Sequence, residues 1–145
     1  MVIMAWYDTA QIPVIEAAME RKDWFTAIVL TATQLERHGY LEVIEYLESL
    51  NANSDMVEEI FEKTSLTQIA KWLLAIKKIE KKEYKTIMKI NDERNKFVHR
   101  REKVGEEEKF KRGAEGKKKY EPLVKEAIRI LKEKFSVVRL AVGKG

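Results

Sequence analysis

The 145-residue chain contains no cysteine and only two histidines, two prolines and six glycines. The absence of cysteine excludes a disulfide-built scaffold, a thiolate zinc site and a cysteine nucleophile. The two histidines, His38 and His99, are too few for a metal centre built from imidazoles. We therefore expect any site in this protein to work without a metal and without a cofactor.

The chain also lacks a long apolar run. No stretch approaches the roughly 18 uncharged apolar residues that a membrane-spanning helix requires. Residues 1–4 are apolar but carry neither the basic segment nor the longer apolar core of a signal peptide. These absences predict a cytoplasmic protein without membrane contact. Charged residues make up 36% of the chain, and this Lys/Glu-rich, cysteine-free composition fits an intracellular protein of a thermophile.

Apolar residues recur with a helical period, and no segment alternates apolar and polar residues for long. Helices are expected at six places: a first one ending near residue 21, then 23–50, 55–63, from 65 onward, 84–100, and a last one starting near 120. The length suits one domain that buries a substantial core. The sequence therefore predicts an all-α fold, a single domain over residues 1–145 with a bundle of five or six helices between about residues 6 and 135.

Local signals indicate where these helices begin and end. Candidate capping residues precede four of them: Asp8 or Thr9, Asp23, Ser54, and Ser65 in a capping box with Gln68. Gly39 is expected either to end or to kink the second helix. Residues 81–83 are interpreted as a charged break, and Pro122 is placed in the first turn of the last helix. The tail, residues 137–145, fits a helical turn, a short strand or a frayed end.

One segment, residues 100–119, accounts for the charge of the whole chain. It holds nine Lys and Arg against five Glu, an excess equal to the net charge of +4. It also contains three of the six glycines and few apolar residues. We interpret it as a charged flexible loop, because long loops in compact domains are usually functional or disordered. The alternative is a solvated stretch with no role in binding.

The helix over residues 84–100 carries an inconsistency in its apolar stripe, which consists of Ile87, Ile90 and Phe97. Arg94 falls on that same face between two of these residues. Asn95 and His99 form an i, i+4 pair on a neighbouring side of the helix. Polar groups on a packing face are expected where function overrides stability, so this helix is the candidate for the functional site.

An arginine, an asparagine and a histidine together suit one type of chemistry. Histidine gives or takes a proton near neutral pH, and arginine holds a phosphate with its planar fork. Asparagine orients either group without titrating. A natural reaction for this set is cleavage of RNA by its own 2′-hydroxyl, in which a base removes the proton and a cation stabilises the phosphorane.

The segment Arg94-Asn-Lys-Phe-Val-His99 resembles the R-x4-6-H motif of the HEPN superfamily, including the polar residue after the arginine. The order of the expected helices is similar over about residues 6–135. The resemblance implies an up-down helical core, a two-fold dimer and a metal-independent endoribonuclease that leaves a 2′,3′-cyclic phosphate. His99 would then be the acid/base group, Arg94 the phosphate clamp and Asn95 the orienting residue.

The resemblance also implies partners. Many such domains act on RNA as toxins. We expect Lys96, Arg100 and Arg101 to line the path by which the RNA phosphates approach the site. Other members are inactive interaction or nucleotide-binding modules, or pair with an antitoxin such as a small nucleotidyltransferase. Some toxins of that paired type carry a tyrosine two positions after the histidine, where this chain has Arg101. Regulation by modification of that tyrosine is therefore not expected.

Each of these residues also has a purely structural interpretation. Arg94 would serve as well in an ion pair with Glu83, Glu93 or a carboxylate on another helix. Asn91 and Asn95 would serve in hydrogen bonds between helices. His99 would be a surface residue that follows Val98.

Overall fold

A computed structural model describes residues 11–99 and 113–135 of the chain. These residues form six helices and no strand, which confirms the all-α class. The helices are α2 (Ile12–Glu20), α3 (Trp24–Ser49), α4 (Ser54–Phe61), α5 (Leu66–Ala75), α6 (Lys81–His99) and α8 (Gly113–Lys134). The candidate caps Asp8 and Thr9, the phosphate-binding candidates Arg100 and Arg101, and the tail 137–145 lie outside the described residues.

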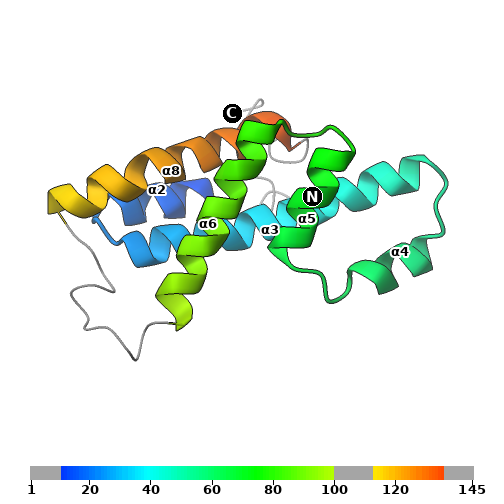
Figure 1. Ribbon diagram of the computed structural model, residues 1–145, viewed down its shortest axis with the longest axis horizontal. Helices are drawn as coiled ribbons and strands as arrows, with labels where there is room; N and C mark the ends of the chain where they lie inside the picture. The colour runs from blue at the N-terminus through cyan, green and yellow to red at the C-terminus, as the bar shows by residue number, and fades with distance from the viewer. Residues whose placement is uncertain (1–10, 100–112, 136–145) are drawn as a thin grey trace.

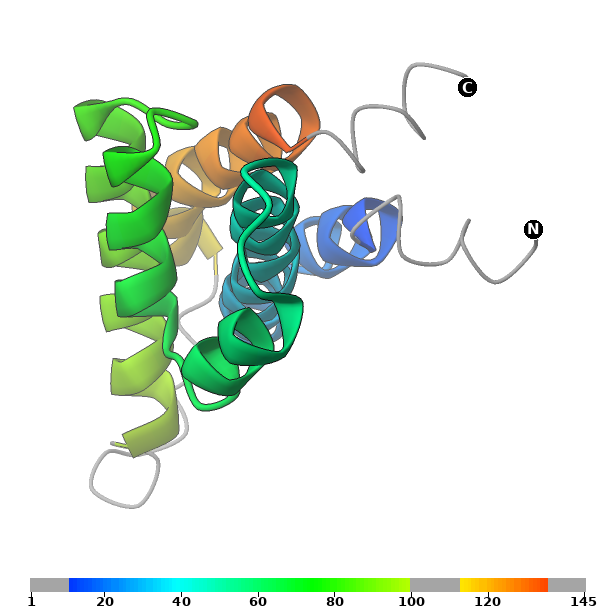
Figure 2. The ribbon, with the colours of Figure 1, turned by 90° about the vertical axis from the view of Figure 1, so that its right-hand side faces the viewer.

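Helix α3 is the centre of the bundle. It runs along the long axis of the molecule, and α6 crosses it at a steep angle in Figure 1. Viewed along that axis, α5 and α6 lie on one side of α3, α2 lies on the other side, and α8 lies across the top (Figure 2). Helix α4 packs back against α3, and α6 also packs against α5 and α8. This arrangement leaves the end of α6 at the edge of the bundle.

The core is built from the apolar faces that the helical periodicity predicts. Its largest fully buried side chains are Trp24, Phe135, Ile15, Ile28, Leu35, Leu66, Ile69, Leu73, Ile87, Ile90, Ile130 and Leu131. They come from α2, α3, α5, α6 and α8 and from the residue that follows α8, so a single core joins these helices. Burial of side chains of this size contributes about 1.5–3 kcal/mol each.

Two of the predicted caps are confirmed, and a third is displaced by one residue. The Asp23 carboxylate accepts a hydrogen bond from the Thr26 N–H at 3.1 Å, and Ser65 Oγ accepts one from the Gln68 N–H at 3.4 Å. The cap of α4 is Asn53, whose Oδ1 accepts from Met56 N–H at 3.0 Å. The prediction of Ser54 was wrong because two adjacent residues both suit the position, and only backbone geometry distinguishes them.

The charged break expected at residues 81–83 is instead the first turn of α6. Glu83 is 1% exposed, and its Oε1 accepts a hydrogen bond from the Glu80 N–H at 2.8 Å. Its Oε2 lies 2.8 Å from Arg129 Nη2 and 3.7 Å from Lys134 Nζ, both on α8. Glu83, which the sequence suggested was part of a charged break, therefore caps α6 and links it to α8.

The surroundings of Glu83 also change its ionisation. Burial opposes the charged form, but the hydrogen bonds from the Glu80 N–H and Arg129, with the charge of Lys134, outweigh burial and lower the carboxyl pKa below its ordinary 4.5. A lowered pKa stabilises the fold above the unfolded-state value, and this stabilisation is lost as the pH falls through the folded-state pKa.

Helix α8 begins at Gly113 rather than near Tyr120, so the last part of the expected loop is helical. Pro122 lies inside this helix and not in its first turn. Tyr120 and Val124, on either side of Pro122, are buried in the core and stabilise the helix at the proline. The expected loop is therefore wrong for residues 113–119, and residues 100–112 lie outside the described residues.

Gly39 neither ends α3 nor interrupts it. A Cβ atom at this position would lie 2.7 Å from Ile69 Cγ2 and 3.2 Å from Leu73 Cδ1, both on α5. The glycine therefore lets α3 and α5 approach closely, which the sequence pattern alone did not indicate.

We expect Gly39→Ala to destabilise the protein by about 1–3 kcal/mol, because overpacking a close helix contact outweighs the gain in helix propensity. Chemical denaturation of the variant measures this loss. In an Ile69→Ala background, which removes the nearest methyl group, the cost of Gly39→Ala should shrink. An equal cost in both backgrounds would contradict the contact as its cause.

Candidate functional site

Helix α6 carries the candidate catalytic residues on the turns that approach its end. Ile87, Ile90 and Phe97 are buried in the core, as the stripe predicts. The side chain of Arg94, on the same face, is 20% exposed. A guanidinium is thus held at the boundary between the core and solvent, where its charge is only partly screened.

Two acceptors orient the Arg94 guanidinium. Its Nη2 donates to Asn91 Oδ1 at 2.7 Å, and its Nη1 lies 3.5 Å from Glu36 Oε2 on α3. Asn91 is itself fixed, because its Nδ2 donates to Thr67 Oγ1 on α5 at 3.3 Å. Thr67, Asn91, Arg94 and Glu36 therefore form a chain of polar contacts that joins three helices.

This polar chain confirms two of the structural interpretations. Arg94 does pair with a carboxylate on another helix, which is Glu36, whereas Glu83 and Glu93 bind other cations. Asn91 does make a hydrogen bond between helices. Sequence reasoning did not find Glu36 or Thr67, because neither carries a local signal and each reaches α6 only through the packing of the helices.

Asn95 lies on the outer side of the same two turns, and His99 follows it in the chain by one helical turn. Asn95 is exposed, and Val98 beside His99 is also exposed. Asn91 rather than Asn95 makes the contact to Arg94. His99 is the last residue of α6, and its side chain lies outside the described part of the structure. Since His38 is buried inside α3, His99 is the one histidine at the end of a helix.

Lys96 belongs to a second cluster of charges, on the side of α6 that faces α8. The Glu93 carboxylate lies 3.5 Å from Lys96 Nζ and 2.9 Å from Lys119 Nζ of α8. The hydrogen bond to Glu93 outweighs burial and raises the pKa of Lys119 above its usual value, so this lysine remains charged. Glu93 thus links Lys96 of α6 to Lys119 of α8.

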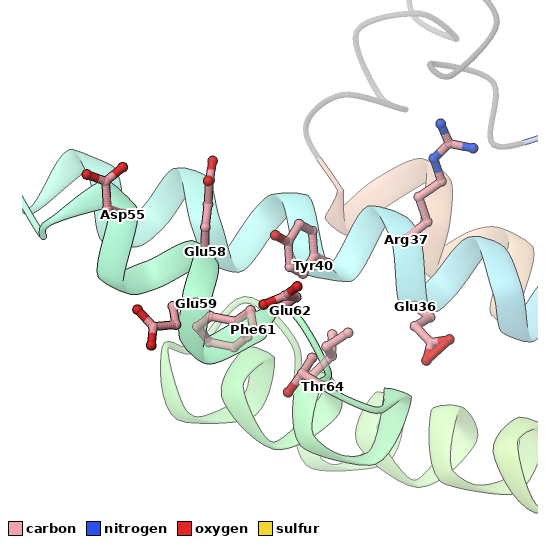
Figure 3. Close-up of a pocket in the computed structure, with 10 residues that line it drawn as sticks. Glu36, Arg37, Tyr40, Asp55, Glu58, Glu59, Phe61, Glu62 and Thr64 are labelled. Atoms are coloured by element: carbon pink, nitrogen blue, oxygen red, sulfur yellow. The ribbon is translucent and has the colours of Figure 1, made fainter.

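An acidic hollow of about 630 Å³ lies between α3 and α4. Figure 3 shows the carboxylates around it, from Glu36, Asp55, Glu58, Glu59 and Glu62. No three of the His, Asp and Glu side chains in the described residues are placed to hold a metal ion together. The concentration of negative charge makes the acidic hollow unfavourable for a phosphate.

Comparisons of the chain with models of protein families, with curated proteins and with solved structures gave no match. Among the helices that the structure describes, none combines the length and the apolar character needed to cross a bilayer. The functional interpretation therefore rests on the residues of α6 and their surroundings.

Proposed function

We propose that this protein is a metal-independent endoribonuclease of the HEPN type. The observation that carries the proposal is the position of Arg94. Its guanidinium is fixed by Asn91 and Glu36 at the edge of the core, on the helix that His99 ends. These contacts leave other N–H groups of the guanidinium available to phosphate oxygens.

In this proposal His99 removes the proton of an RNA 2′-hydroxyl, and the resulting oxygen attacks the adjacent phosphorus. The bond from phosphorus to the 5′-oxygen breaks, and that oxygen leaves with a proton. The products are a 2′,3′-cyclic phosphate and a 5′-hydroxyl. Arg94 stabilises the negative charge that develops on the phosphoryl oxygens, and Asn95 orients the imidazole or the phosphate.

A two-fold dimer belongs to the proposal, because one Arg and one His make a sparse site. Two copies of α6 facing each other would supply one group to accept the first proton and another to donate the second. The exposed Asn95 and Val98 would then lie near the facing helix. Light scattering that finds only a monomer at the concentration of the cleavage assay would contradict this arrangement.

The experiment that tests the proposed activity is cleavage of mixed single-stranded and structured RNAs in EDTA. We expect cleavage to persist without divalent metal and the products to end in 2′,3′-cyclic phosphates. A matched substrate with 2′-deoxyribose at the cleaved positions should be resistant, because it lacks the attacking hydroxyl. Cleavage of that substrate, or a strict need for metal, would contradict the mechanism.

A second candidate function is a noncatalytic interaction module that binds a partner such as a small nucleotidyltransferase. The observation that favours it is that Glu36 and Asn91 already give Arg94 a structural role. Exposed apolar side chains on α4, Met56 and Ile60, add surface for a partner. Under this alternative, Arg94→Ala weakens a copurifying complex while no RNA cleavage is found.

A further inference from the structure

A groove of about 590 Å³ lies between α6 and α8, and the residues that line it come from these two helices. Four lysines line it, Lys89 and Lys96 from α6 and Lys118 and Lys119 from α8. We refer to these four residues and the hollow between them as the lysine groove. Neither helix alone would show this feature, because it forms only where the two helices pack together.

Glu93 organises two of the four ammonium groups. It is 7% exposed and contacts Lys96 and Lys119, so it holds one lysine from each helix at the wall of the groove. A buried carboxylate shared by two cations leaves a local excess of positive charge and fixes its position.

The other two lysines, Lys89 and Lys118, are exposed and make no ion pair with the described residues. Lys89 and Lys96 are seven residues apart, so they lie on one face of α6 about 10.5 Å apart along its axis. Ammonium groups in a row along a groove are suited to successive phosphates of one strand.

The remaining lining residues argue against recognition of bases. The apolar part of the lining comes from Pro122 and Leu123, and none of the described residues that line the groove carries an aromatic ring on which a base could stack. Of the carboxylates, Glu93 binds two lysines and Glu126 binds Arg129, which leaves Asp92 as the one that opposes an anion most directly. The lysine groove is therefore suited to binding a phosphate backbone without preference for the base sequence.

We propose that the lysine groove binds the phosphodiester backbone of single-stranded RNA and leads that strand toward the end of α6. The identification of this strand as RNA rests on the proposed function. Positions 96 and 99 are three residues apart on α6, so a strand bound at Lys96 passes the helix position of His99. The groove thus extends the candidate site along α6 and onto α8.

The test measures binding of fluorescent oligouridylate to the His99→Ala protein, which prevents cleavage during the measurement. The double variant Lys89→Ala/Lys118→Ala should lower the affinity about tenfold at low salt. It should also reduce the slope of log affinity against log salt by about 1.4, since each lost phosphate contact on a single strand removes about 0.7. Both lysines are exposed, so the variant retains its fold.

The matched control is Lys63→Ala/Lys71→Ala, which removes two exposed lysines outside the lysine groove. It changes the net charge equally and should change the affinity by less than about twofold. Equal losses in both double variants would overturn the proposal, because the effect would then reflect net charge alone.

A second comparison replaces carboxylates instead of lysines, and here we expect oligouridylate to bind more tightly rather than more weakly. Glu93→Gln raises the charge of the groove by one and should tighten oligouridylate binding several-fold, whereas Glu59→Gln at the acidic hollow should have little effect. Tightening by Glu59→Gln alone would place the strand at the acidic hollow and overturn the proposal.

The two proposals fail separately. If the wild-type protein cuts RNA but the groove variants bind and cut RNA as the control variants do, the proposal that the lysine groove binds RNA fails and the proposed endoribonuclease activity stands. If oligouridylate binding depends on Lys89 and Lys118 while the wild-type protein cuts no RNA, the lysine groove stands and the enzyme is wrong.

Discussion

Replacing His99 with alanine is expected to lower the rate of RNA cleavage by about 10²–10⁴-fold, the usual contribution of a general acid or base. His99 ends α6, and in the proposed reaction its imidazole takes the proton of the 2′-hydroxyl. Single-turnover cleavage in EDTA, measured from pH 5 to 9, gives both the rate and its pH profile. The part of the pH dependence that the imidazole provides should disappear with it.

The control for this variant is its stability, because partial unfolding would also lower the cleavage rate. His99→Ala should unfold within about 0.5 kcal/mol of the wild-type protein, as surface substitutions usually do. A variant that is equally stable and still cuts within a few-fold of the wild-type rate would contradict the role of His99.

Replacing Arg94 with alanine is expected to lower the cleavage rate by about 10²–10³-fold, as loss of a donor that stabilises transition-state charge does. It should also lower the free energy of unfolding, by about 1–3 kcal/mol, because Asn91 and Glu36 lose their shared partner. Arg94→Lys keeps the charge but not the planar fork, so its rate should recover only in part.

Glu36→Gln is the matched variant that separates these two effects. It breaks the same ion pair from the other side but leaves the guanidinium and its hydrogen bond to Asn91 in place. We expect a smaller loss of stability than that of Arg94→Ala, because one contact of the guanidinium is lost rather than two, and a change in rate below about tenfold. If Glu36→Gln reduces the rate as much as Arg94→Ala, the arginine acts by holding the helices together, and the assignment of Arg94 to the phosphate fails.

The features predicted correctly from the sequence are those that depend on near neighbours. The caps Asp23 and Ser65 each bond a backbone N–H three residues on, and the apolar face of α6 repeats within one helix. Helical period and short side-chain-to-backbone bonds are local properties, so they can be read from a short window of sequence.

The features that were missed depend on residues far apart in the chain. Glu83 appeared to be part of a charged break because its partner Arg129 lies 46 residues away on α8. Helix α8 extends back to Gly113 through a segment rich in glycine and lysine, which propensity alone disfavours. Its packing against α3 and α6 provides the stabilisation that local propensity does not.

The candidate site divides in the same way. Arg94, Asn95 and His99 could be selected because they interrupt a pattern within one helix. Glu36, which pairs with Arg94 from 58 residues away, could not be selected before α3 and α6 were seen to cross. The lysine groove likewise depends on which face of α8 packs against α6.

The placement of the two charged regions has a consequence for how the molecule meets a polyanion. Helix α4, with its carboxylates, and the first half of α8, with its lysines, lie at opposite ends of the long axis (Figure 1). A separation of this kind gives the described part of the molecule an electric dipole moment along its length. The field of an approaching nucleic acid exerts a torque on such a dipole and turns the lysine end forward before contact. The fraction of encounters that begin in a productive orientation is then set by ionic strength as well as by the shape of the site.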